Sequence, residues 1–105
     1  MLLVQKFGGS SLADVHRLRR AAEIALRARR EGQDLIVVVS AMGESTDELL
    51  RLAQEIDPSP SPRELDALLS TGEQQSAALF AAAWRALADD LNRRLPPKGA
   101  RRFVF

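Results

Sequence analysis

The sequence predicts an α/β protein built around a short parallel sheet. Two apolar runs of strand character, residues 2–7 and residues 35–39, flank a longer segment whose apolar side chains recur at helical spacing. The second run is β-branched without polar alternation, which favours a strand covered on both faces, as in parallel sheets. Strand, helix and strand in this order form a βαβ unit, and we expect its crossover to be right-handed.

The composition is that of one small globular domain, and it argues against several partners. The chain has 105 residues, of which 46% are hydrophobic and 28% charged, enough for a modest core. A formal net charge of +1 does not indicate a nucleic-acid or membrane partner. Cysteine does not occur, so disulfides and thiolate metal sites are excluded. Because no apolar run approaches the roughly 20 residues of a membrane span and no signal-peptide layout is present, we expect a cytoplasmic location.

The first candidate site lies at Lys6 to Ser11, where the first strand turns into the first helix. A lysine, two adjacent glycines and two serines occupy this turn. Glycine lets the backbone approach a ligand closely, and the following helix N-terminus offers unpaired N–H groups and a positive dipole end. With the charge of Lys6, these features suit a phosphate group. The spacing is that of neither a P-loop nor the GxGxxG motif, and a tight turn with a solvated lysine remains the alternative.

The first helix is expected to follow this turn. Ser10 or Ser11 can cap it, Asp14 in its first turn suits the dipole, and Gly32 fits its C-terminal end. Its many arginines are most simply a solvated face, because no aromatic residues alternate with them. His16 has no second histidine or acidic cluster at ligand spacing and is expected at the surface. The predicted apolar side consists of Val15, Leu18, Ala22, Ala25 and Leu26.

A second loop, Ser40 to Thr46, follows the second strand and leads into another helix. Ser45 and Glu48 fit a capping box, and apolar residues at helical spacing continue to Ile56. The sequence Asp-Pro-Ser-Pro at residues 57–60 then ends this helix.

The rest of the chain predicts a further helical segment with an interruption. A serine, a proline and a glutamate at residues 61–64 form a strong helix start. The polar residues 70–73 are expected to interrupt or bend this segment before a long helix that ends at the prolines 96–97. Residues 101–105 are compatible with a third, short strand. The predicted apolar side of the long helix consists of Ala77, Phe80, Ala81, Trp84, Leu87 and Leu91.

Both loops are expected at one edge of the sheet, because ligands of open parallel sheets bind beyond the carboxyl ends of the strands. Lys6 with two helix N-termini suits phosphoryl transfer, in which catalysis is mostly positioning and charge stabilisation. Glu73, beside Gly72 in the polar break, is placed to reach a substrate ammonium group. The plain structural readings stay open: Thr46 can help to cap a helix, and Glu73 can be a first-turn dipole partner. The sequence predicts no metal site.

Taken together, these residues resemble the N-terminal part of the catalytic domain of the aspartate kinases, in the amino-acid-kinase fold family. The resemblance covers residues 1–88 and implies part of a three-layer αβα sandwich with a short parallel sheet. Residues 89–105 diverge from the family pattern. The matching segments, in order and spacing, are Val4 to Ser11, Val37 to Gly43 running into Ser45 to Leu50, and Leu68 to Gln74 with Ser76.

The resemblance implies a role for each matched site residue. Lys6 would bind the ATP phosphates and stabilise the transferring group, while the amides of Gly8 and Gly9 contact the same phosphates. Ser10, where the family usually has threonine, would lie nearby. The loop residue Ser40 would also face the phosphates. The positions that hold the amino-acid substrate are those of Thr46 and Glu73.

The implied reaction transfers the ATP γ-phosphoryl group to the β-carboxylate of L-aspartate with Mg²⁺, giving 4-phospho-L-aspartate. It opens the route to lysine, threonine and methionine. The family's catalytic domain is much longer, and the missing part carries the adenine and ribose site and catalytic acidic residues. We therefore expect residues 1–105 to be a truncated kinase domain, inactive or nearly so by itself, that lacks its remainder or forms a homo-oligomer. The alternatives are a non-catalytic module that binds an anion or self-associates through its exposed sheet edge, and a product without function.

Overall fold

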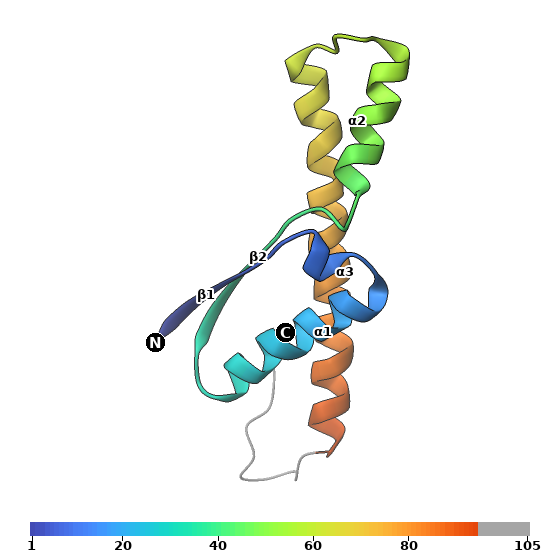
Figure 1. The fold of residues 1–105 in the computed structure, drawn as a ribbon. Coiled ribbons are helices and arrows are strands. Elements are labelled where there is room, and N and C mark those ends of the chain that lie inside the picture. The colour runs from blue at the N-terminus through green and yellow to red at the C-terminus, as the bar shows by residue number, and fades with distance from the viewer. Residues whose placement is uncertain (95–105) are drawn as a thin grey trace.

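The sheet carries a helical layer on one face, and a helical hairpin extends away from both (Figure 1). The computed structural model describes residues 1–94. The two strands are β1 (Leu2–Phe7) and β2 (Asp34–Val39). The helical elements are the 3-10 turn η1 (Ser10–Leu12), α1 (Val15–Arg30), α2 (Ser45–Ile56) and α3 (Pro62–Arg94). The predicted helix end at residues 96–97 and the predicted strand at residues 101–105 lie outside the described residues.

The two strands pair in parallel, with Leu2 opposite Asp34 and Phe7 opposite Val39. This confirms the predicted α/β class with a short parallel sheet. Side chains alternate between half-buried and exposed along both strands, and the inward side chains pack towards α1 and α3. The outward face is open: Val4 is 60% and Ile36 is 49% exposed. The expectation that β2 is covered on both faces is therefore wrong for the described residues, which provide the sheet and one helical layer.

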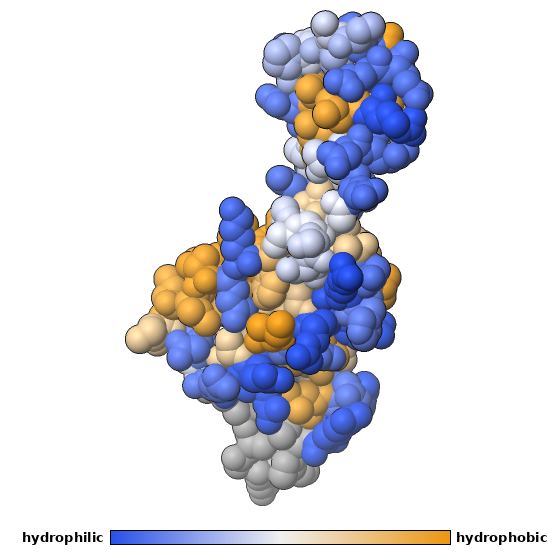
Figure 2. Space-filling model, viewed as in Figure 1, coloured by the Kyte–Doolittle hydropathy of each residue, from blue (hydrophilic) through white to orange (hydrophobic). Residues whose placement is uncertain are grey.

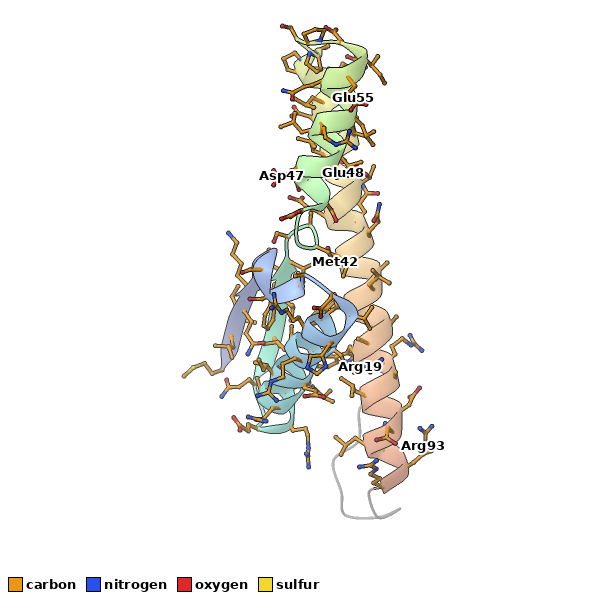
Figure 3. The ribbon with its side chains drawn as sticks, turned by 45° about the vertical axis from the view of Figure 1, so that its right-hand side comes forward. Arg19, Met42, Asp47, Glu48, Glu55 and Arg93 are labelled. Atoms are coloured by element: carbon orange, nitrogen blue, oxygen red, sulfur yellow. The ribbon has the colours of Figure 1, made fainter. Side chains whose placement is uncertain are left out.

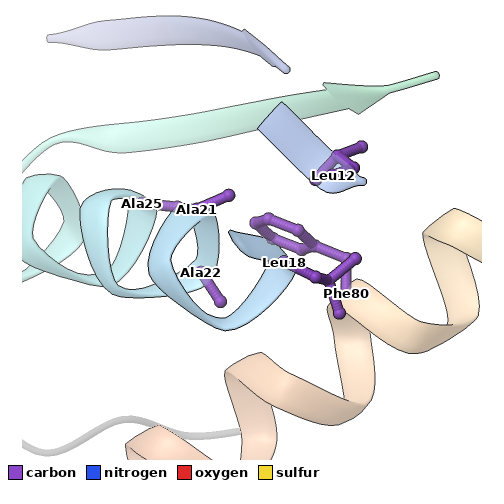
Figure 4. Close-up of a cluster of buried hydrophobic side chains, with 6 residues drawn as sticks. All are labelled: Leu12, Leu18, Ala21, Ala22, Ala25 and Phe80. Carbon is purple, nitrogen blue, oxygen red and sulfur yellow. The ribbon is translucent and has the colours of Figure 1, made fainter. Parts of the chain in front are cut away.

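The core lies between α1, α3 and the inward face of the sheet (Figure 4). Small side chains on α1 let the helix approach its neighbours closely, and one aromatic ring from α3 fills the space between them. That ring, Phe80, is 5.9 Å from the ring of Phe7 between centroids, at a tilt of 34°. The buried cluster consists of Leu12, Leu18, Ala21, Ala22, Ala25 and Phe80.

The start of α1 differs from the prediction. Asp14 is the N-cap: its backbone is extended and its carboxylate accepts a 2.8 Å hydrogen bond from the amide of Arg17. Ser10 and Ser11 do not cap this helix, because they belong to the separate turn η1. The far end agrees with the prediction, since Gly32 follows the C-cap with a φ of 97°.

The predicted break at residues 70–73 does not exist, because α3 runs without interruption from Pro62 to Arg94. Hydroxyl side chains in this stretch bond back to preceding carbonyls, as in Thr71 Oγ1 to Leu68 O at 2.7 Å, so the helix accommodates them. Gly72 serves packing: a Cβ there would lie 3.0 Å from the Cβ of Ala41. A glycine inside the helix thus marks the point where α3 meets the second loop.

The hairpin of α2 and the N-terminal half of α3 extends beyond the core. No residue of α2 is buried. The predicted capping box does not form, because Glu44 occupies the N-cap position without a side-chain hydrogen bond and Ser45 is already helical. The molecule measures 60 × 26 × 20 Å with a radius of gyration of 17.2 Å. A compact domain of about 100 residues would have a radius of gyration of about 13 Å, so the chain is distinctly elongated.

Candidate phosphate-binding site

The turn after β1 presents a row of backbone amides at the carboxyl end of the strand. Carbonyl groups close this turn: Gly8 accepts from the amide of Ser11 and Gly9 accepts from the amide of Leu12, both at 3.1 Å. Within residues 1–94, no hydrogen bond uses the amides of Gly8, Gly9 or Ser10. Successive unpaired N–H groups of this kind form a concave site for an anion.

The second loop holds the first in place. The amide of Gly43 donates to Gly9 O at 2.9 Å, and the amide of Ser40 donates to Phe7 O at 3.1 Å. The Ser40 hydroxyl also donates to Phe7 O, at 3.4 Å. The two loops therefore lie together at one edge of the sheet, as predicted from the parallel pairing.

The two adjacent glycines have different surroundings. A Cβ at Gly9 would lie 3.1 Å from Ala41 O and 3.2 Å from Gly43 O, so the close contact between the loops requires glycine. A Cβ at Gly8 would meet no atom within 4 Å, and Gly8 is exposed. The packing of residues 1–94 thus explains Gly9 but not Gly8, beside which a Cβ would meet only open space.

Polar side chains on either side of the two glycines in the sequence are exposed. Lys6 lies on the outward face of β1, opposite Val38 in the register, and is exposed. Ser10 is exposed in η1, whereas Ser40 is half-buried and its hydroxyl is already bonded. The turn thus offers one cation, one exposed hydroxyl and unpaired amides to a ligand.

The two residues expected to hold a substrate lie on different helices. Thr46 is exposed in the first turn of α2, where the neighbouring labelled side chains Asp47 and Glu48 also lie (Figure 3). Glu73 is exposed on α3, next to Gly72 and hence next to the contact with Ala41. Among the described residues, no hydrogen bond or ion pair joins Lys6, Thr46 and Glu73 to one another.

The structure does not support a purely structural role for Thr46 as a helix cap or for Glu73 as a partner of the helix dipole. No side-chain hydrogen bond caps α2, so neither Ser45 nor Thr46 acts as its cap. Glu73 lies in the interior of α3 rather than in its first turn, so it does not pair with the helix dipole. Their side chains are therefore available for another role.

Sequence reasoning missed the contacts that lock the site together. Gly43 has a φ of 49°, and a Cβ placed on it would lie 3.3 Å from Ala13 Cα. Gly72 packs against Ala41. The only signal in the sequence is the small size of these residues, which does not say what they contact.

Two further kinds of feature, a metal cluster and a membrane-spanning helix, do not occur in the described residues. In the part of the chain that the structure describes, no three histidine, cysteine, aspartate or glutamate residues gather in a way that could hold a metal ion. The same part of the chain contains no helix that is long and apolar enough to span a membrane.

Comparisons with known proteins agree on a family. Residues 1–89 match the model of the amino acid kinase family. An aspartokinase from Mycobacterium tuberculosis is 56% identical over 86 residues, which are 82% of this chain and 20% of that protein. Aspartokinase 2 from Bacillus subtilis is 50% identical over 82 residues, 78% of this chain and 20% of that protein.

A solved structure agrees with these sequence relatives. The crystal structure of aspartate kinase from Synechocystis superposes with a TM-score of 0.81 at 52% identity, over 83% of this chain and 15% of that chain. The chain spans about a fifth of the length of the curated relatives it matches. The resemblance read from the three sequence segments is confirmed, and the chain belongs to the amino acid kinase family.

Proposed function

We propose that this chain is the phosphate-binding part of an aspartokinase-type kinase domain. The observation that carries the proposal is the row of unpaired amides at Gly8, Gly9 and Ser10, beside open space and at the carboxyl end of β1. Phosphate oxygens are the ligands that such amides bind best. The identity of 50–56% to aspartokinases supports ATP as the phosphate donor and L-aspartate as the acceptor.

In this reaction the chain would bind and stabilise the negative charge of the phosphates, and it would not form a covalent bond to the substrate. Amides of the turn would bind the β- and γ-phosphates, and the ammonium of Lys6 would stabilise the charge on the transferring group. The β-carboxylate of L-aspartate would attack the γ-phosphorus directly and ADP would leave, so 4-phospho-L-aspartate forms. Such a product would feed lysine, threonine and methionine synthesis, a cytoplasmic process.

The substrate would lie between the two loops and α3. Thr46 has a free hydroxyl at the start of α2, where the helix dipole favours an anionic group such as a carboxylate. Glu73 supplies a carboxylate for the substrate ammonium from the turn of α3 that contacts Ala41. Mg²⁺ is implied by the family, and among the described residues no three histidine, cysteine, aspartate or glutamate side chains gather in a way that could hold it.

The chain alone should turn over little or no ATP. The chain spans about a fifth of the length of the curated aspartokinases it matches, and the adenine and ribose of ATP would be bound by the rest of that domain. The second candidate, a non-catalytic anion-binding module, is favoured by this same observation. Both functions use the turn at Gly8 to Ser10, and they differ in whether the bound phosphate is transferred.

The experiment that tests the proposal restores the rest of the domain. The chain is joined to the sequence of the Mycobacterium tuberculosis aspartokinase that follows its matched residues, and aspartate-dependent ADP release is measured. We expect turnover in the hybrid and none in the chain alone. Lys6→Ala should lower kcat in the hybrid about 10²–10³-fold, the range for removing a group that stabilises transition-state charge.

The control is Arg27→Ala, which removes an exposed cation from α1 and should leave turnover unchanged within about twofold. Circular dichroism checks that each variant is folded. A folded hybrid whose turnover survives Lys6→Ala would remove Lys6 from catalysis. Phosphate binding without any turnover in a folded hybrid would favour the non-catalytic module.

A further inference from the structure

One alanine of the second loop touches both the phosphate turn and α3. Ala41 is 6% exposed, and its carbonyl oxygen would lie 3.1 Å from a Cβ placed on Gly9. Its own Cβ would lie 3.0 Å from a Cβ placed on Gly72. Both distances are shorter than the about 3.5–4.0 Å that is optimal between non-bonded carbon atoms, so neither glycine leaves room for a side chain. Ala41 therefore fills the space between the turn and the helix.

Hydrogen bonds on both sides of Ala41 attach the second loop to the phosphate turn. Before it in the sequence, the amide of Ser40 donates to Phe7 O at 3.1 Å. After it, the amide of Gly43 donates to Gly9 O at 2.9 Å. Because both bonds end on the turn or on the residue just before it, Ala41 keeps a fixed place relative to the amides that would bind phosphate.

The same loop leads directly into α2, which carries Thr46. The amide of Ser45, the first residue of α2, donates to Met42 O at 2.9 Å. Figure 3 shows Met42 between the sheet and α2. The loop thus holds the start of α2 beside the phosphate turn, and the place of Thr46 relative to the turn is set by the loop.

Glu73 lies on the other side of the contact, because it follows Gly72 in α3. The hydroxyl of Ser76 donates to Gly72 O at 3.2 Å, and Ser76 is 0% exposed, so the turn of α3 that carries Glu73 is closely packed. Figure 2 shows residues of intermediate hydropathy where the hairpin joins the rest of the molecule. The distance from Glu73 to the phosphate turn therefore depends on how closely α3 approaches Ala41.

We propose that Ala41 is a positioning residue that, with Gly72, determines the length of the amino acid that the site accepts. The inference rests on the proposed function, in which the turn holds the phosphates and Glu73 holds the substrate ammonium group. The acceptor then spans the distance from the transferring phosphorus to Glu73, and the contact of Ala41 with Gly72 sets this distance. A short span favours L-aspartate over L-glutamate, which has one methylene more between its α-carbon and the attacking carboxylate.

The test widens the contact by one methyl group in the hybrid with the Mycobacterium tuberculosis aspartokinase. Gly72→Ala must move α3 away from Ala41 by about 0.5–1 Å to restore an ordinary carbon–carbon distance. We expect kcat/KM for L-aspartate to fall about tenfold, because a misplacement of about 1 Å costs up to about 10²-fold in rate. The KM for ATP should stay within about twofold, since the turn does not move.

L-Glutamate serves as the longer competitor in the same assay. The ratio of its inhibition constant to the KM for L-aspartate should fall about tenfold in Gly72→Ala, the range for one methylene in a fitted pocket. A loss of stability alone would not change this ratio, so the measurement separates a role in positioning from a structural role.

Exchanging the two residues tests whether the contact itself is responsible. Gly72→Ala with Ala41→Gly moves the methyl group from the loop to the helix, and this double variant should recover kcat/KM for L-aspartate to within about threefold of the wild type. Ala41→Ser enlarges the contact from the loop side and should act in the same direction as Gly72→Ala, so it replaces that variant if circular dichroism shows it unfolded. Gln75→Ala, exposed on α3, is the matched control and should leave all constants unchanged.

The outcomes separate this inference from the proposed function. A folded wild-type hybrid without aspartate-dependent turnover would overturn the proposed function, and the inference with it. An active hybrid would leave the proposed function standing. In that hybrid, equal losses for L-aspartate and ATP, an unchanged inhibition ratio, or a double variant no better than Gly72→Ala would each overturn the inference alone.

Discussion

The two ends of α3 lie in very different surroundings. The C-terminal half packs Phe80 into a cluster with α1 and the sheet, whereas the N-terminal half pairs with α2, which buries no residue. The sheet, α1 and the C-terminal half of α3, here called the body, therefore share a core. The hairpin instead has amphipathic helices with exposed charges. The candidate phosphate site lies beside the junction of these regions, because Gly9 of its turn packs closely against Ala41, the residue that also contacts Gly72. We infer that the body determines the stability of the chain and that the hairpin depends on it.

The largest expected difference is between a core and a hairpin truncation. Phe80→Ala removes a ring that is 7% exposed and should lower the free energy of unfolding by about 3–4 kcal/mol. Ile56→Ala removes a side chain that is 88% exposed and should change it by less than about 0.5 kcal/mol. Urea unfolding followed by Trp84 fluorescence measures both. Equal losses would show that the hairpin contributes as much stability as the core.

The junction between the regions should give an intermediate effect. Gly72→Ala places a Cβ 3.0 Å from the Cβ of Ala41, and we expect a net loss of about 1–2 kcal/mol although alanine favours helix. Ala41→Gly removes the opposing Cβ. The double variant should recover most of the loss from Gly72→Ala, and purely additive effects in this cycle would show that the two residues do not compete for the space.

The smallest effect concerns the charges of the hairpin. The hydrogen bond from Arg51, together with its charge, lowers the pKa of Glu48 below its ordinary value of 4.5. Because the folded pKa is lowered, this pair stabilises α2 above pH 4.5, and the contribution is lost as the pH falls through the folded pKa. In an NMR titration, Arg51→Gln should raise the pKa of Glu48 towards 4.5. An unchanged pKa would show that the pair does not form in solution.

The elements that could be predicted from the sequence are those with a strong local pattern. Residues 35–39 form a strand because the run is β-branched, and the parallel pairing then brings the two loops to one edge. The resemblance of three spaced segments was confirmed by the family match.

The errors arose where a side-chain bond or a contact distant in sequence overrides the local pattern. The hydroxyls of Ser70 and Thr71 look like a helix break, but they bond to carbonyls three residues earlier in their own helix. Gly72 is needed opposite Ala41, which is distant in the sequence. The outward face of β2 was expected to be covered, yet residues 1–94 do not cover it, and Ile36 is 49% exposed. The roles of Lys6 and Glu73 remain predictions, because their side chains make no contact here that would test them.

The central claim, that the turn at Gly8 to Ser10 binds phosphate, is tested most directly by titrating the ¹⁵N-labelled chain with inorganic pyrophosphate. We predict that the largest amide shifts occur at Gly8, Gly9 and Ser10, and that Lys6→Ala weakens binding about tenfold, as expected for loss of one charge-assisted contact. Arg63→Ala is the matched control and should bind as the wild type does. Shifts confined to the arginines of α1, or binding unaffected by Lys6→Ala, would contradict the account.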